Sequence, residues 1–223
     1  MSFRSFDAYA TEFFQNYSID SDTNLFNIFA LFSGVYQRYS ADLRDSTTIL
    51  LNNVTIKFNK DPVFYNYIIF NAKKLYALLD DITTPLLNFS SRILNKFKLS
   101  CVYVGKGSSI RKNMHIYYAK KIDGCYAFQK SSNNSKNILE LWKRNMGICI
   151  LQLPVETNHF EAHCKEYALI KAINLRHLNN QINGTAYGCM KMWNDTEVRN
   201  FGNMLLYYAM NICINERPAI IKH

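Results

Sequence analysis

The sequence predicts an α/β fold in which a small three-stranded sheet is flanked by helices and preceded by an N-terminal helical extension. Short runs rich in aromatic and β-branched residues recur along the chain, and segments with helical periodicity separate them. The chain has 223 residues, of which 48% are hydrophobic. This composition is sufficient for one large domain with a packed core.

The first 60 residues differ in pattern from the rest of the chain. Residues 22–39, DTNLFNIFALFSGVYQRY, begin with residues suited to capping a helix and carry apolar side chains on most faces, which is typical of a buried helix. A helix lying on a membrane surface is the alternative, but its polar face lacks the usual cluster of Lys and Arg. We therefore interpret residues 1–60 as a helical extension and residues 61–223 as the domain that carries the chemistry.

The second domain begins with two predicted strands. The run VFYNYIIF, residues 63–70, predicts the first strand. Residues 73–97 have a helical period that Pro85 interrupts, which predicts an insertion of undefined shape. The run KLSCVYVG, residues 98–105, predicts the second strand, and the following Gly-Lys-Gly predicts that it ends in a turn at residues 105–107.

Helices and one further strand follow in the rest of the chain. The pattern predicts helices over 109–121 and 135–145, and the run GICILQLPV over 147–155 predicts the third strand. A strongly periodic helix is predicted over 157–178, and a last helix over 195–214 after a turn rich in Gly and Asn. This order of strands and helices is that of a layered α/β fold.

Charge and cysteine usage limit the classes of partner and compartment. The formal net charge of +9 suits an anionic partner, either nucleic acid or a membrane surface. No apolar run approaches the roughly 18 residues that a membrane span requires, so we expect no membrane insertion. The six cysteines form no Cys-x-x-Cys pair, which disfavours a structural zinc site and predicts a reduced, intracellular protein in the nucleus, the cytoplasm or both.

A basic cluster follows the second predicted strand. Arg111 and His115 are four residues apart, so on a helix their side chains share a face. Lys106, in the preceding turn, adds another positive group beside the backbone of two glycines. Such a cluster can hold a phosphate, although a solvated basic helix start is the plain alternative. Neither a Walker loop nor a dinucleotide-binding fingerprint is present.

The helix after the third strand supplies candidate carboxylates. Glu161 lies in its first turn, where the helix dipole favours a negative charge and where it can also serve as ligand to a hard divalent ion. Glu166 lies about 140° further round the helix, so we expect that the two do not share a site. Asn180, where the helix gives way to a turn, is either a helix C-cap or a polar contact to substrate.

The order of these residues resembles that of the GIY-YIG nucleases. The segment Tyr103-Val104-Gly105 corresponds to the second motif, and Arg111, His115, Glu161 and Asn180 follow in the order of that family. The first motif, normally Gly-Ile-Tyr, falls on Asn66-Tyr67, where only the tyrosine matches.

A narrower resemblance rests on longer segments. YVGKG, ILELWKRNMG, FEAHCKEYALIKA and LNNQINGTAYG are similar to the nuclease domain of the animal ankyrin-repeat and LEM-domain endonucleases. In that subfamily the first motif also departs from Gly-Ile-Tyr. The resemblance covers about residues 63–215, and neither ankyrin repeats nor a LEM domain is recognisable.

The resemblance implies a metal-dependent endonuclease that hydrolyses phosphodiester bonds in DNA, with branched or bridging DNA as the suggested substrate. Tyr67 and Tyr103 are expected to meet at the active site, where one of them helps to deprotonate the nucleophile. Arg111 is expected to contact the scissile phosphate. His115 is expected to assist by hydrogen bonding or proton transfer.

The resemblance also implies a cofactor and further contacts. Glu161 is expected to hold a single divalent ion, Mg²⁺ or Mn²⁺. Asn180 is expected to orient backbone or substrate, and Gly105 and Lys106 to contact the substrate, the lysine being our own assignment from charge and position. A DNA-binding module without catalysis, and a thiol or zinc protein, are the alternatives. The complete set of polar motif positions disfavours the first, and the cysteine spacing disfavours the second.

Overall fold

The computed structural model describes residues 41–50, 52, 63–82, 91–124, 132–153, 157–180 and 182–223. The segment 22–39, Pro85 and Pro154 lie outside these residues. The fold is α/β with a three-stranded sheet, which confirms the predicted fold class. Among the described residues, no helix combines the length and hydropathy needed to cross a bilayer.

The sheet is antiparallel, and its central strand comes first in the chain. The strands are β1 (Phe64–Asn71), β2 (Cys101–Ser108) and β3 (Ile148–Gln152), in the order β2-β1-β3. From Tyr65 to Asn71, β1 is buried on both faces, which explains its nearly continuous apolar and aromatic sequence. The strand β2 forms one edge of the sheet, and the candidate site lies at this edge.

The turn predicted at Gly105–Gly107 is wrong, because β2 continues through these residues. The chain turns at Ser109 and Ile110, where Ser109 adopts a φ of 52°. The two glycines provide space instead. A Cβ atom at Gly105 would lie 2.6 Å from the hydroxyl oxygen of Tyr67, and one at Gly107 would overlap the side chain of Arg111.

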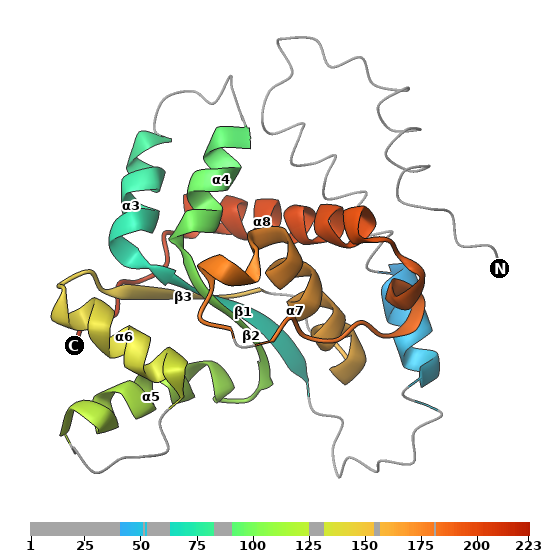
Figure 1. Ribbon diagram of the computed structural model, residues 1–223, viewed down its shortest axis with the longest axis horizontal. Helices are drawn as coiled ribbons and strands as arrows, with labels where there is room; N and C mark the ends of the chain where they lie inside the picture. Colours follow the sequence, from blue (N-terminus) through green and yellow to red (C-terminus); the bar gives the residue numbers. More distant parts are fainter. Residues whose placement is uncertain are drawn as a thin grey trace.

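Helices cover both faces of the sheet (Figure 1). One face is covered by α3 (Ala72–Asp81), α4 (Ser91–Ser100), α7 (His159–Ile173) and α8 (Asp195–Glu216). The opposite face is covered by α5 (Arg111–Gly124) and α6 (Asn133–Lys143). Two short 3₁₀ helices, η1 (Leu175–His177) and η2 (Gly188–Met192), lie between α7 and α8.

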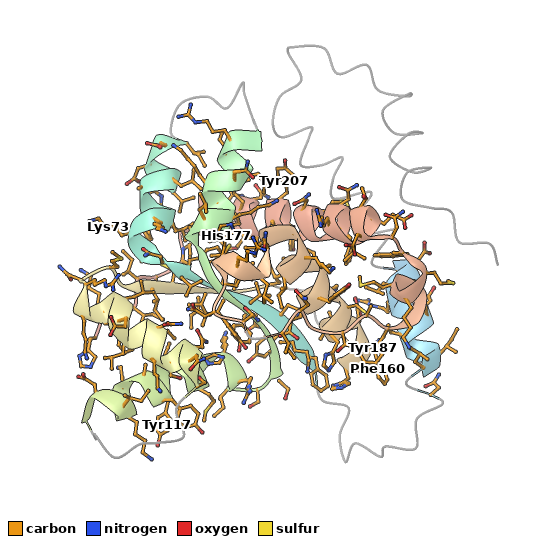
Figure 2. All side chains as sticks on the ribbon, in the orientation of Figure 1. Lys73, Tyr117, Phe160, His177, Tyr187 and Tyr207 are labelled. Carbon is orange, nitrogen blue, oxygen red and sulfur yellow. The ribbon has the colours of Figure 1, made fainter. Side chains whose placement is uncertain are left out.

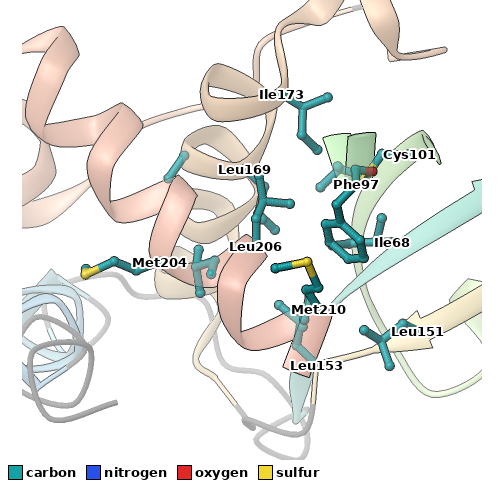
Figure 3. Packing of buried hydrophobic residues seen from close by; sticks show 14 of the residues in the cluster. Ile68, Phe97, Cys101, Leu151, Leu153, Leu169, Ile173, Met204, Leu206 and Met210 are labelled. Carbon is teal, nitrogen blue, oxygen red and sulfur yellow. Dashed lines mark hydrogen bonds between the residues drawn. The ribbon is translucent and has the colours of Figure 1, made fainter. Parts of the chain in front are cut away.

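The two faces of β1 differ in chemistry. On the α7 side, Ile68 packs in an apolar core with residues such as Leu169, Leu206 and Met210 (Figure 3). On the α5 side, β1 presents Tyr65 and Tyr67 with Ile69 to a smaller core that includes Ala119, Ile138 and Trp142. The tyrosine hydroxyls therefore need hydrogen-bond partners on the α5 side, because an unpaired buried hydroxyl is costly.

The start of α7 is fixed by a cap and by a helix over residues 41–50. Asn158 caps α7 by accepting a hydrogen bond from the backbone N–H of Glu161 at 2.8 Å. The Asn158 side chain also donates to the hydroxyl of Thr47 at 2.9 Å. Leu43, on the same helix, is fully buried in the larger core. The described part of the predicted extension therefore packs against the domain.

Candidate active site

Three ring side chains meet on the α5 side of the sheet. The hydroxyl of Tyr67 lies 2.7 Å from Nε2 of His115, and both residues are buried. The ring centroid of Tyr103 lies 6.1 Å from that of Tyr67 and 4.9 Å from that of His115. The structure thus brings together the two tyrosines and the histidine that the sequence analysis selected.

Tyr65 positions the turn that leads to Arg111. Its hydroxyl donates to the backbone oxygen of Ser109 at 2.6 Å and accepts the backbone N–H of Lys112 at 3.3 Å. These two bonds hold the β2–α5 turn against the sheet. Because Gly107 has no side chain, the stem of Arg111 lies directly against β2. Tyr65 was not among the residues predicted for the site. It lies two residues before Tyr67 and therefore on the same face of β1, and this spacing could have identified it.

Arg111 lines an open cleft beside this ring cluster. The cleft has a volume of about 410 Å³ and is lined by Phe64, Lys106, Gly107, Ser108, Ile110, Arg111 and Met114. Its two charged side chains are both cationic, and Arg111 is exposed. Two cations beside a partly apolar wall suit an anionic group such as a phosphate.

Glu166, not Glu161, is the carboxylate next to this cluster. The carboxylate of Glu166 accepts the backbone N–H of Lys106 and interacts electrostatically with the side chains of Lys106 and Arg111. Its charge also acts on both Tyr67 and Tyr103. Burial raises the pKa of Glu166 to about 7, although Lys106 and Arg111 oppose the shift. A carboxyl group with this pKa titrates at neutral pH.

Glu166 of α7 lies near the tyrosines because, among the described residues, β2 has no neighbouring strand on its outer edge. Asn179 donates its backbone N–H to the Val102 oxygen at 2.8 Å, and the side-chain amide of Asn180 pairs with the backbone of Val104 at 3.0 and 2.8 Å. Glu166 continues this row by accepting the N–H of Lys106. These groups replace a neighbouring strand along the edge. The Glu166 carboxylate therefore lies at the margin of the sheet.

The side chain of Asn180 forms hydrogen bonds with the backbone of β2. Its side-chain oxygen accepts the backbone N–H of Val104, and its side-chain nitrogen donates to the backbone oxygen of Val104. Val104 lies between Tyr103 and Gly105. This geometry agrees with the expectation that Asn180 orients backbone, and it gives no support to a substrate contact. Asn180 fixes the segment of β2 that carries Tyr103.

The structure does not bring Glu161 to the cluster, contrary to the sequence-based expectation. The side chain of Glu161 is fully buried, and its carboxylate pairs with Nζ of Lys165 at 2.7 Å and with Nε of Arg44 at 3.5 Å. The expected separation of Glu161 from Glu166 around the helix is correct, and of these two carboxylates it is Glu166 that lies next to the ring cluster. A position in the first turn of α7 therefore does not by itself bring a carboxylate to the cluster.

Burial dominates the protonation of the ring cluster. Burial, and next Tyr103, raises the pKa of Tyr67, while Arg111 opposes the shift. Burial, and next Glu166, raises the pKa of Tyr103, and again Arg111 opposes it. Burial and then Arg111 lower the pKa of His115 to about 4. At neutral pH the cluster therefore holds two neutral phenols around a neutral imidazole, joined by the Tyr67–His115 hydrogen bond and by tilted or edge-to-face ring contacts.

The donor set at the cleft fits a divalent ion that takes most of its ligands from elsewhere. The described residues include no group of three or more His, Cys, Asp or Glu side chains that could hold a metal. Glu166 offers one carboxylate beside the cationic cleft. Mg²⁺ is commonly bound by one or two carboxylates, with water and phosphate oxygens completing its shell. The site fits such an ion and does not fit a structural zinc centre.

Known proteins with similar sequences span much more than this domain. The chain is 28% identical over 167 residues to "Ankyrin repeat and LEM domain-containing protein 1 homolog" of Caenorhabditis elegans, covering 71% of this chain and 22% of that protein. It is 28% identical over 149 residues to "Ankyrin repeat and LEM domain-containing protein 1" of Homo sapiens, covering 63% and 24%. The chain thus spans less than a quarter of the length of these relatives. No solved structure matches it.

A family model described as "LEM-3-like GIY-YIG domain" matches residues 64–223. The match begins at the first residue of β1 and includes every element that contributes to the ring cluster, the cleft and the β2 edge. The helix over residues 41–50 lies outside the match. The family model covers the sheet and all helices from α3 onward. The chain therefore belongs to the LEM-3-like GIY-YIG domain family, a family of nuclease domains.

Proposed function

We propose that this domain is a metal-dependent endonuclease that hydrolyses phosphodiester bonds in DNA. The observation that carries the proposal is the meeting of Tyr67, Tyr103, His115 and Glu166 beside the cleft lined by Arg111. These groups come from two strands and two helices. Together they provide a phosphate-binding cation, a proton path and a carboxylate for a hard metal ion.

Arg111 and Lys106 bind the phosphate in this proposal. The stem of the Arg111 side chain lies against Gly107, and the residue lines the cleft, so its charge is available there to a phosphate. A positioned cation stabilises the negative charge that develops on phosphoryl oxygens during hydrolysis. Lys106 lines the same cleft, and burial lowers its pKa while Glu166 opposes that shift.

Tyr67 and His115 form the proton path. The neutral imidazole of His115 can accept a proton through Nε2, which lies 2.7 Å from the phenolic oxygen. Tyr67 can then take a proton from the attacking water while it passes its own proton to His115. This relay avoids a free phenolate, which the raised pKa of Tyr67 disfavours. Tyr103 packs against both rings and faces the same charges.

Glu166 would hold the divalent ion, Mg²⁺ or Mn²⁺. Such an ion, when bound, acts as a Lewis acid on the phosphoryl oxygen and the leaving group. Arg111 and Lys106 oppose the rise in the pKa of Glu166, which keeps its carboxylate available as a ligand. The hydrogen bond from the Lys106 backbone fixes the carboxylate at the sheet edge.

We further propose that the substrate is branched DNA and that the protein acts in the nucleus or the cytoplasm. The sequence resemblance supports the substrate, and the formal net charge of +9 supports a polyanionic partner. Cys101, Cys149, Cys164, Cys189 and Cys213 are free and buried, which fits a reducing compartment.

A cleavage assay tests the proposal. Labelled four-way junctions, flaps and linear duplexes are incubated with the full chain in Mg²⁺, in Mn²⁺ or in EDTA. We expect cleavage products with either metal and none in EDTA. Arg111→Met should lose cleavage by at least about 100-fold, whereas Arg144→Met, at an exposed position at the end of α6, should retain it. Binding without cleavage in both metal conditions would instead support the inactive DNA-binding module.

A further inference from the structure

One side of α7 extends the candidate site beyond Glu166. His159, His163 and Glu166 occupy positions i, i+4 and i+7, so their side chains form one stripe along the helix. The charge of Lys106 acts on all three residues. The two histidines therefore face the same region as Glu166, yet the proposed hydrolysis uses neither of them.

The histidines belong to a continuous row of rings that begins at the cleft. Phe64, a cleft residue, lies 5.0 Å from His159 between ring centroids, and His159 lies 4.8 Å from His163. His163 in turn lies 5.4 Å from Tyr187, which precedes η2. We call these four residues the aromatic row. Figure 2 shows Tyr187 beside Phe160 near the start of α7, and their ring centroids are 4.8 Å apart.

The aromatic row is partly exposed and bordered by cations. None of its four rings is fully buried. Lys106 borders the row at the cleft, and Nζ of Lys191 lies 5.9 Å from the ring centroid of Tyr187 at the other end. Ordinary packing of α7 against the segment before η2 would account for ring contacts. It does not account for their continuity with the cleft or for the lysine at each end.

The protonation of the row favours stacking over phosphate binding. Burial, then Lys106, then His159 lowers the pKa of His163 to about 4. Burial and then Lys106 lower the pKa of His159 as well. Both imidazoles are therefore neutral at physiological pH and present flat aromatic surfaces, while the neighbouring lysines carry the positive charge. Aromatic faces interleaved with cations are the usual composition of a single-strand binding surface.

We propose that the aromatic row is a stacking site for unpaired bases of the same DNA strand whose phosphate lies in the cleft. This proposal rests on the proposed function and adds a substrate requirement to it. In a duplex, each base face is covered by its neighbours, so only unpaired nucleotides can place a base against these rings. The row would thus favour cleavage close to a single-stranded segment.

The test compares DNA binding with and without unpaired bases. A blunt duplex and a forked duplex with short unpaired arms are bound in EDTA, and fluorescence anisotropy gives each Kd. A 2-aminopurine in one arm reports stacking through its quenching. His163→Leu and Tyr187→Leu should weaken binding of the forked DNA by about 5- to 100-fold and restore 2-aminopurine fluorescence. Binding of the blunt duplex should change by less than about twofold in both variants.

Two controls separate stacking from folding and from charge. Tyr117→Leu removes an exposed tyrosine on α5, outside the row, and should leave both affinities unchanged. His163→Phe retains a flat ring and should retain binding of the forked DNA. Equal losses on forked and blunt DNA, or no loss on either, would overturn the stacking site while leaving the nuclease proposal intact. A wild-type chain that binds neither DNA would overturn both proposals.

Discussion

Glu161 and Glu166 lie five residues apart on α7, and their carboxylates have different neighbours. Glu161 faces Lys165 of its own helix and Arg44 of the helix over residues 41–50. Glu166 faces the edge of β2, where it accepts a backbone N–H and lies near two cations of the cleft. The first carboxylate is fully buried, and the second remains partly accessible.

This difference shows that neighbouring elements, not the helix itself, decide the environment of each carboxylate. A fully buried carboxylate is tolerated when a matching cation is buried with it, and such a pair contributes to structure. A partly accessible carboxylate with a raised pKa, beside a cleft, is the arrangement typical of functional sites. Substitutions on the two sides of α7 should therefore affect different properties, stability on the structural side, which carries Glu161, and cleavage on the functional side, which carries Glu166.

The largest expected effect is on activity at the functional side. Glu166→Gln removes the ligand charge while preserving side-chain shape, so metal-dependent cleavage should fall by at least about 1,000-fold. The thermal stability of the Glu166→Gln variant should not decrease, because burial already disfavours the charged form of Glu166 in the wild type. Glu161→Gln is the matched variant, and its folded fraction should still cut DNA. Cleavage that survives Glu166→Gln but not Glu161→Gln would reverse the assignment.

The next largest effect is on stability at the structural side. Lys165→Met leaves the Glu161 carboxylate without its closest cation, which should lower the free energy of unfolding by about 3–5 kcal/mol. Urea denaturation followed by circular dichroism measures this change. The double variant Glu161→Leu/Lys165→Met removes both charges and should recover most of the loss. A double variant as unstable as the single one would show that the pair itself, not the stranded charge, provides the stability.

The sequence predicted the fold and part of the site for identifiable reasons. Strand β1 and the helices α5 and α7 were predictable because aromatic runs and helical periodicity are local signals. Arg111 and His115 were predictable because a spacing of four residues fixes a common helix face. Which of Glu161 and Glu166 lies near the ring cluster was not predictable, because it depends on the distant Arg44 and on the edge of β2.

The continuation of β2 through Gly105 and Gly107 was not predictable from the sequence for a similar reason. Glycines usually interrupt strands, and Gly105 and Gly107 therefore predicted a turn. Their actual use is to accommodate Tyr67 and Arg111, which approach from β1 and α5. Such close contacts between separate elements leave no periodic pattern in the sequence.

The pH dependence of stability tests the environment of the ring cluster. The pKa of His115 in the folded chain is about 4, below the value of about 6.5 for an unfolded histidine. The unfolded chain therefore binds more protons between these values, and stability falls as the pH is lowered through this window. Between about pH 7.5 and pH 5, His115→Gln should lose about 2 kcal/mol less stability than the wild type. His177→Gln, at an exposed position, should behave as the wild type. A His115→Gln variant with the same pH dependence as the wild type would contradict the buried, neutral histidine.

The smallest expected effect concerns the backbone on which both tyrosines depend. Asn180→Ala removes two hydrogen bonds to Val104 and should cost about 1–2 kcal/mol of stability. Asn179→Ala is the matched control, since Asn179 contacts Val102 through its backbone N–H, which alanine retains. If Asn180 only stabilised the fold, cleavage by the folded variant would be normal. If it also aligns Tyr103 and the Lys106 backbone that holds Glu166, kcat should fall several-fold while KM stays unchanged. That split would link the edge of β2 to the functional side of α7.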